Sequence, residues 1–336
     1  MPASDRPIFI VGAPRSGTTL LSLMVHAHPR LAMPPETRFV LRIWRDRHRF
    51  GDLSSREQHR ALARACVAKG SMVRDLGVSK RELKRRILAA PPTLGSAFAA
   101  VFAAYAQVHG KARWGDKRPT YFAEVDVLLR LFPDAQIVHV VRDGRAVVAS
   151  LKRMPWWEGS SVGAMATWAQ AEYCARRDER RLPPDTVHVL RYESLVEDPR
   201  GLLRRLCAFL EEDFDEAMLE PHRVAGVVPD RKEWHEGLRS SLTTQRRATW
   251  REGLEPWELG LMETVLRRPL QRRGYDLSGV GDRPSPLAIA RLLAAMASRH
   301  AAMRQRWVRE RLDASRSRQP VAARLTSGQR RAGSSG

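Results

Sequence analysis

A glycine-containing turn near the N-terminus limits what this chain can fold into more than any other feature. The stretch Ile8–Leu20 reads IFIVGAPRSGTTL. Its β-branched start predicts a short strand over residues 7–11, and the run that begins at Thr18 predicts a helix to about Ala27. A turn between a strand and a helix points several backbone N–H groups at one place, beside the partial positive charge of the helix start. The turn therefore favours binding of an anion.

The turn is similar to a nucleotide phosphate loop, but it has no lysine. The Walker A pattern is G-x-x-x-x-G-K-[ST]. Gly12 and Gly17 have its spacing, while Thr18 stands in the lysine position and Arg15 brings a positive charge inside the turn. A threonine in the lysine position suits a shorter anion, in which a single phosphate carries one terminal group. The residues expected to hold it are Arg15, Ser16, Gly17, Thr18 and Thr19.

A second candidate anion site lies in the middle of the chain. The segment IVHVVRDGRAVVAS runs from a predicted strand into a predicted helix. Arg142 stands where the strand ends, which is the edge at which ligands bind in open α/β sheets, and Ser150 lies two turns into the helix. Two separate anion sites would suit a nucleotide that carries phosphate on both its 5′ and its 3′ side.

Strands and helices alternate along the body of the chain. We expect further strands within Ala135–Asp143 and over Thr186–Val196, a polar link at Lys111–Tyr121, and a last helix of the body over Glu255–Arg272. Alternation of helices with β-branched strands predicts an α/β fold with a parallel sheet between helices. The fold class is therefore a three-layer sandwich of the P-loop type, with an added basic helix at the C-terminal end.

Positive charge is concentrated toward the C-terminus. The 336-residue chain has a formal net charge of +21, which indicates an anionic partner. From Pro284 onward it has 11 arginines and two acids, and Pro284 to about Arg311 predicts a basic amphipathic helix. We expect disorder from Ala314 on. These patterns divide the chain into a domain at 1–281 and a basic part at 282–336, whose helix could contact an anionic membrane surface.

Cysteine and hydropathy patterns exclude several classes. The three cysteines are scattered and odd in number, which argues against a disulfide framework and against a zinc site. No run of about 18 apolar residues predicts a membrane span. The first strand begins near residue 7, which leaves no room for a signal peptide. We expect a cytoplasmic protein that uses no metal.

Several motifs, taken in order, resemble one enzyme family. PRSGTTL near the N-terminus and VVRDGRAVVAS in mid-chain are similar to the sulfotransferases that use 3′-phosphoadenosine-5′-phosphosulfate (PAPS). AHPRLAMPPETR, GDKRP and LRYESLVEDP resemble segments of the protein-tyrosine sulfotransferase branch. The ordered set covers about residues 7–215. The resemblance implies a PAPS-dependent transfer of a sulfuryl group to a hydroxyl acceptor, which is a small molecule, a glycan, a lipid or a peptide.

The resemblance also implies roles for single residues. Those of the N-terminal turn would hold the 5′-phosphosulfate, Arg142 and Ser150 the 3′-phosphate, and Tyr192 would lie near the nucleotide. Glu36 matches the family's general base, which takes the proton of the acceptor hydroxyl. Lys117 and Arg15 would meet the negative charge on the departing oxygen. Arg38 matches an arginine near the acceptor, and residues 239–251 match the place where the family closes over its nucleotide.

Other interpretations stay open at this point. The tyrosine-modifying branch is membrane-anchored and relies on disulfides, and this chain shows neither feature. A small-molecule kinase would need the loop lysine and Mg²⁺ ligands, and Thr18 argues against it. A binding protein for anionic surfaces would use the basic C-terminal part. His28 and His139 lie near the motifs, and we expect structural roles for both. We expect no nucleic acid partner and keep a homodimer as an alternative to a monomer.

Overall fold

Five parallel strands form the centre of the molecule. The computed structural model describes residues 4–227, 250–316 and 321–322. In the described residues the sheet has the order β2-β3-β1-β4-β5, and every neighbouring pair is parallel. The strands are β1 (Ile8–Gly12), β2 (Leu31–Ala32), β3 (Arg113–Lys117), β4 (Gln136–Val141) and β5 (Val187–Arg191). The predicted parallel α/β architecture is confirmed.

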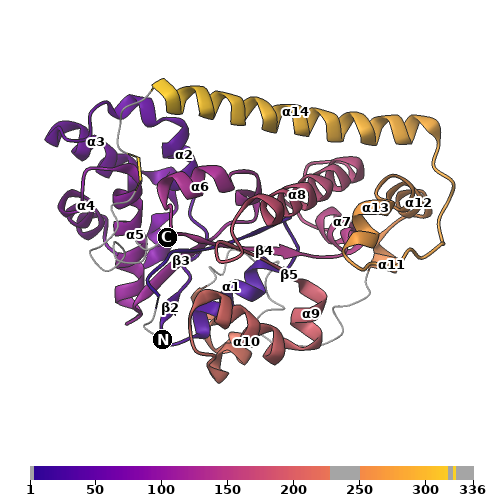
Figure 1. The fold of residues 1–336 in the computed structure, drawn as a ribbon, viewed down its shortest axis with the longest axis horizontal. Coiled ribbons are helices and arrows are strands. Elements are labelled where there is room, and N and C mark those ends of the chain that lie inside the picture. Colours follow the sequence, from indigo (N-terminus) through magenta and orange to yellow (C-terminus); the bar gives the residue numbers. More distant parts are fainter. Residues whose placement is uncertain (1–3, 228–249, 317–320, 323–336) are drawn as a thin grey trace.

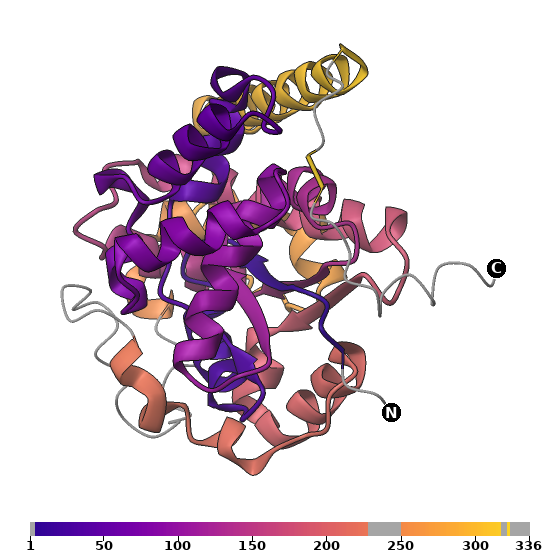
Figure 2. The same cartoon turned by 90° about the vertical axis from the view of Figure 1, so that its left-hand side faces the viewer.

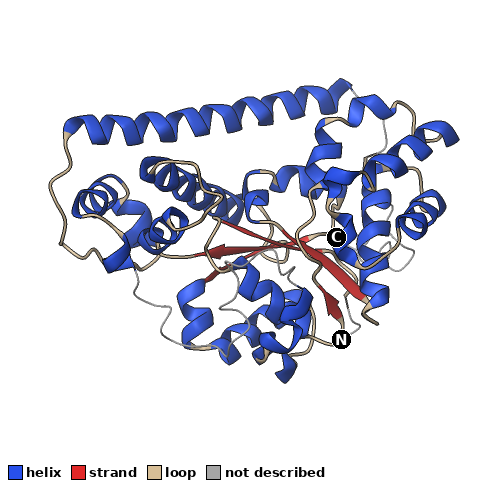
Figure 3. Ribbon diagram, turned by 180° about the vertical axis from the view of Figure 1, so that it is seen from behind, coloured by secondary structure: helices blue, strands red, loops and turns tan. Residues whose placement is uncertain are grey.

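Alternating side chains of the strands build two separate cores. Phe9 and Val11 of β1 face one hydrophobic cluster, and Ile8 and Ile10 face the other, because successive side chains point to opposite faces of a sheet. Figure 3 shows helices on both sides of the strands. The helices are α1 (Thr18–Ala27), α2 (Phe39–Arg45), α3 (Arg56–Cys66), α4 (Lys80–Ala89), α5 (Leu94–Val108), α6 (Val125–Leu131), α7 (Gly144–Lys152), α8 (Ser161–Arg181), α9 (Tyr192–Glu197), α10 (Pro199–Leu210), α11 (Trp250–Gly253), α12 (Pro256–Val265), α13 (Arg267–Arg272) and α14 (Pro286–Arg316). Of these, α1, α9 and α10 pack on the face that carries Ile8 and Ile10.

Three local expectations were wrong. The segment Lys111–Tyr121, expected as a polar link, contains β3, whose polar side chains are buried because the folded chain supplies their partners. The strand expected over the whole of Thr186–Val196 ends at Arg191, and Tyr192 begins α9. The helix expected over Glu255–Arg272 is interrupted at Leu266, so that α12 and α13 are separate.

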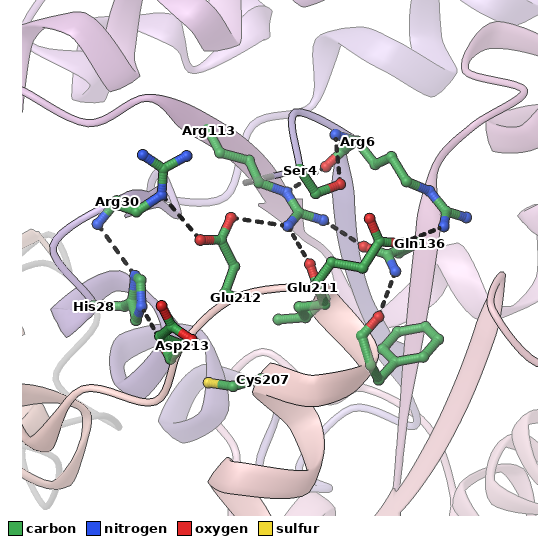
Figure 4. Close-up of polar contacts among 12 residues, drawn as sticks. Ser4, Arg6, His28, Arg30, Arg113, Gln136, Cys207, Glu211, Glu212 and Asp213 are labelled. Carbon is green, nitrogen blue, oxygen red and sulfur yellow. Dashed lines mark hydrogen bonds and ion pairs between the residues drawn. The ribbon is translucent and has the colours of Figure 1, made fainter. Parts of the chain in front are cut away.

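A buried polar network joins the amino-terminal ends of the strands (Figure 4). Arg113, fully buried at the start of β3, donates from Nη1 to the carbonyl oxygen of Leu210 at 2.6 Å and to Glu212 at 3.2 Å. It also donates to Gln136 at the start of β4, and Gln136 donates to the carbonyl oxygen of Phe209 at 2.6 Å. A buried guanidinium is stable only when its donors are satisfied, and these contacts tie α10 to the sheet.

The long helix α14 crosses one side of the molecule (Figure 1). It packs along α8, and its Leu292 and Met303 are fully buried in the hydrophobic cluster of the body. In the view turned by 90°, α14 lies at the edge of the molecule (Figure 2). The helix continues through 314–316, and the remaining residues of the expected disordered tail, apart from 321–322, lie outside the described residues. In the described parts of the chain, no helix is long and apolar enough to span a membrane.

Candidate functional site

The strand order brings the candidate residues to one edge of the sheet. Strand β1 leads into the glycine-containing turn, and β3 and β4 lie on either side of it. Ile10 pairs with Lys117 at the end of β3, and Gly12 pairs with Val140, two residues before Arg142. Because parallel strands end at the same edge, Lys117 and Arg142 flank the turn from opposite sides.

The turn itself requires its two glycines. A Cβ atom on Gly12 would lie 2.4 Å from the carbonyl oxygen of Val140, and one on Gly17 would lie 2.2 Å from Cδ2 of Tyr192. Tyr192 follows β5 and places its ring directly against the turn. Gly17 has φ 95° and caps α1, which has no side-chain cap, so the first N–H groups of the helix have no partner within it. Such a helix start suits an anion.

Arg15, Arg142 and Ser150 form a cationic cluster beside the turn. Arg15 adopts a left-handed backbone with φ 71°, and its carbonyl oxygen accepts a hydrogen bond from Arg142 Nη1 at 2.9 Å. Its Nε donates to the hydroxyl of Ser150 at 3.1 Å, and the Arg142 guanidinium lies 4.3 Å from the centre of the Tyr192 ring. Burial, together with the nearby charges of Arg142 and Arg153, lowers the pKa of Arg15 to about 10. Such crowding of positive charge favours a multiply charged anion.

Lys117 and Glu36 meet on the other side of the turn. The buried Lys117 ammonium donates to Oγ1 of Thr19 at 3.1 Å and forms an ion pair with Glu36. Glu36 follows β2, which pairs with β3, and the preceding Pro34 and Pro35 are buried. The ion pair thus holds a carboxylate and an ammonium side by side next to the turn.

The sequence reasoning missed two residues of the site, one on each side of the turn. Asp116, fully buried next to Lys117, accepts hydrogen bonds from the Lys117 N–H at 2.9 Å and from the hydroxyl of Tyr121 at 2.9 Å. Burial raises the pKa of Asp116 to about 7. The acid directly before a candidate lysine was visible in GDKRP, but only the fold shows that it is buried. Arg153, beside Ser150 along the chain, is the second addition because it adds positive charge near Arg15.

Three other candidates have different surroundings. The buried Ser16 hydroxyl donates to the carbonyl oxygen of Ala13 at 2.6 Å and so closes the turn from within. Thr18 is buried as the first residue of α1. Arg38 is exposed, and among the described residues no hydrogen bond or ion pair joins its side chain to Glu36 or Lys117. Of the predicted closing segment at 239–251, only Trp250 and Arg251 belong to the described part of the chain.

His28 and His139 make hydrogen bonds within the fold, in agreement with the structural roles expected for them. The His28 ring accepts a hydrogen bond from the Arg30 N–H at 3.1 Å and contacts the carbonyl oxygen of Asp213 at 2.9 Å. It follows the C-terminal end of α1, a helix length of about 15 Å from the turn. His139 is buried in β4 and contacts Asp178 at 3.1 Å.

Comparison with known proteins agrees with this geometry. The sequence profile of the sulfotransferase family matches residues 7–216, more than half of the chain. The chain belongs to the sulfotransferase family. The family and the enzyme class predicted from the sequence are confirmed. The matched range ends before α14, so the C-terminal helix lies outside the part that defines the family.

Individual relatives of this sulfotransferase-family protein are distant. A protein-tyrosine sulfotransferase of Drosophila melanogaster is 29% identical over 63% of this chain and 39% of its own length. Nodulation protein NoeE of Sinorhizobium fredii is 28% identical over 80% of this chain and 64% of its own length. The chain thus spans less than two thirds of both. The solved sulfotransferase domain of the Synechococcus PCC 7002 olefin synthase has a TM-score of 0.55 and 24% identity, covering 82% of this chain and 98% of that domain, and it shares the fold.

Proposed function

We propose that this protein transfers the sulfuryl group of PAPS to a hydroxyl group of its acceptor, with Glu36 as general base. One observation carries the proposal. The turn between β1 and α1 has a cationic cluster on one side and a Lys117–Glu36 ion pair on the other. The first arrangement suits a nucleotide with two separate phosphate groups, and the second suits proton transfer beside a developing negative charge.

The residues present fit PAPS. The start of α1, which has no side-chain cap, and the hydroxyl of Thr19 would hold the phosphosulfate, which supplies the sulfuryl group when bound. Arg142 and Ser150 would hold the 3′-phosphate. Tyr192, which packs against Gly17, would lie beside the nucleoside. A Cβ at Gly17 would displace that ring, so the cradle depends on a glycine there.

The ion pair gives each partner a part in the chemistry. The Glu36 carboxylate would accept the proton of the acceptor hydroxyl as that oxygen attacks sulfur. The ammonium of Lys117 would stabilise the negative charge that gathers on the departing phosphate oxygen, together with Arg15. Asp116 and Tyr121 would position Lys117 through the end of β3.

A kinase fits the site less well. The turn has no lysine of its own, and the ammonium beside it comes from β3 instead. Within the described ranges no group of three or more His, Cys, Asp and Glu side chains is arranged to hold a metal ion. That finding leaves the expected independence from metal a prediction, which a comparison of activity with Mg²⁺ and with a chelator would check.

The acceptor of this proposed reaction is a hydroxyl compound. The Drosophila relative has a name that specifies protein tyrosine. A tyrosine peptide is therefore the first acceptor to test, followed by glycans and lipid alcohols. Mass spectrometry of reactions with ³⁴S-labelled PAPS identifies the product by its added sulfuryl mass.

Nucleotide binding tests the proposal directly. Calorimetry should show that 3′-phosphoadenosine-5′-phosphate binds much more tightly than ATP. Arg142→Ala should lose at least about 30-fold in affinity, the scale for removing one partner of a buried charge pair. With adenosine 5′-phosphate, which has no 3′-phosphate, wild type and variant should bind alike. Arg60→Ala, an exposed change on α3, is the matched control. Equal affinity of the wild type for the two nucleotides would contradict the proposal.

A further inference from the structure

We propose that the outer face of α14 binds an anionic lipid surface, a function separate from the proposed transfer reaction. The helix lies along the edge of the molecule, with one side on α8 (Figure 1, Figure 3). The opposite side faces away from the body in both views. The two sides of α14 differ in charge and in chemistry, and this difference indicates the kind of partner.

The inner side of α14 is fixed to the body. Glu310 accepts hydrogen bonds from the Trp44 indole at 2.9 Å and from Arg47 at 3.0 Å. Asp313 accepts a second bond from Arg47 at 3.1 Å. The Arg177 guanidinium lies 4.0 Å from the centre of the Trp307 ring. Both acids of the helix are therefore turned toward the body.

The outer side of α14 combines an apolar stripe with arginines. Residues that recur at helical spacing and are exposed form the stripe: Leu287, Ala290, Ala294, Ala297, Ala301 and Val308. Leu287 and Val308 are 61% and 56% exposed, which is high for large apolar side chains in a helix that is anchored elsewhere.

Exposed arginines border the stripe on both sides. Arg291 and Arg309 lie on one border, since they are 18 residues or five turns apart, and Arg304 and Arg311 lie on the other. No exposed acid lies on this face within the described part of α14. An apolar stripe between two rows of cations is the pattern of a helix that lies in the plane of an anionic membrane surface. Arginine stems reach around the apolar stripe toward lipid phosphates.

Charge decides between the partners that such a face could take. A second copy of this chain would place arginine rows against arginine rows, because the two acids of α14 are held by Arg47 inside. A nucleic acid would satisfy the arginines but leave the apolar stripe against water. An anionic lipid surface satisfies both parts of the face.

Vesicle sedimentation with the full chain tests this proposal. The protein should sediment with phosphatidylcholine vesicles that contain phosphatidylglycerol, and not with phosphatidylcholine alone, and the binding should weaken as salt is raised. Arg304→Glu/Arg309→Glu should weaken it at least about 25-fold, because each cation near the surface contributes about five-fold. Leu287→Ser/Val308→Ser should weaken it several-fold without any change in charge.

Matched variants separate this face from charge in general. Arg204→Glu/Arg205→Glu changes net charge equally on α10, on the opposite side of the molecule (Figure 1), and should cost less than about three-fold. Arg304→Gln/Arg309→Gln should give about half the logarithmic effect of the glutamate pair, with an unchanged melting temperature. Equal losses in the α14 and α10 glutamate variants would overturn the proposal. So would binding to a DNA duplex without binding to vesicles, or a dimer in ultracentrifugation that Arg304→Glu/Arg309→Glu dissociates.

Discussion

Lys117 connects the two halves of the candidate site. Its ammonium contacts Thr19 at the start of α1 and Glu36 after β2, so one side chain joins the glycine-containing turn to the proposed base. A kinase-type loop carries such a lysine within its own sequence. Here a neighbouring strand supplies it, and the lysine is held by a backbone bond to the buried Asp116.

Replacing Glu36 by glutamine should abolish most of the transfer. The amide keeps the size of the side chain but cannot accept the proton, so turnover should fall by about 10²–10⁴-fold. Affinity for 3′-phosphoadenosine-5′-phosphate should stay within a few-fold. Radiolabel transfer from ³⁵S-PAPS to the acceptor measures the first quantity and calorimetry the second. Glu57→Gln, an exposed change on α3, is the control, and near-normal turnover of Glu36→Gln would place the base elsewhere.

The buried His26 should make stability depend on pH. Burial, with a smaller effect of the nearby Lys111 charge, lowers the pKa of His26 from 6.5 to about 3. Between these values the unfolded chain holds a proton that the folded chain does not. Stability therefore falls as pH is lowered, by up to about 1.4 kcal/mol per pH unit from this group. Urea unfolding of wild type and His26→Asn, which keeps an acceptor for the Met33 N–H, should show a smaller slope in the variant. Equal slopes would show that His26 already titrates normally in the folded state.

Individual elements are held in place by polar contacts at their ends. Strand β3 has Arg113 at one end and Asp116 with Lys117 at the other. Distant segments supply the partners of Arg113 and Lys117, while Asp116 accepts from the nearby Tyr121. Helix α14 is held in the same manner. Its Glu310 accepts hydrogen bonds from Trp44 of α2, from Arg47 directly after α2 and from Arg130 of α6. An element of this kind is stable only together with its partners.

Removing the Glu310 carboxylate should loosen α14. Glu310→Ala removes one of the two carboxylates that pair with the buried Arg47, leaving Asp313, and leaves the Trp44 indole N–H without its acceptor. The free energy of unfolding should fall by about 2 kcal/mol, between the cost of one lost hydrogen bond and that of a broken buried pair. Urea denaturation measures this change. The adjacent exposed Arg309→Ala should stay within about 0.5 kcal/mol, and an equal effect of both would argue against an anchoring role.

At the scale of the whole molecule, the division into 1–281 and 282–336 stays a prediction. Every residue proposed to bind the nucleotide lies before position 281, while Leu292 and Met303 complete the core of the body. The C-terminal part is thus expected to contribute stability and surface chemistry, with the transfer site built by the preceding residues.

A chain that ends at Gly281 should still bind the nucleotide but melt earlier. Loss of the buried Leu292 and Met303 alone removes about 3–6 kcal/mol of hydrophobic stabilisation. At about 2–4 °C per kcal/mol, the melting temperature should drop by about 10 °C or more. Thermal melts should show that 3′-phosphoadenosine-5′-phosphate raises the melting temperature of both chains. A folded short chain with no response to the nucleotide would show that the C-terminal part completes the site.

The sequence by itself determined the features that depend on neighbours along the chain. Apolar residues at strand and helix spacing predicted β1, α1, β4 and α7, because these patterns act within a few residues. The glycines of the turn and the order of the motifs predicted the family. The helical character of α14 was visible in the same way.

Only the tertiary structure decided which polar residues meet. Strand β3 looked like a link because its side chains are charged, and their burial is stable only where distant partners neutralise or bond them. The order β2-β3-β1-β4-β5 placed Lys117 and Glu36 on one side of the turn and Arg142 on the other. Tertiary packing also decided which face of α14 is exposed, because α8 and Arg47 cover one side of the helix and leave the other at the surface.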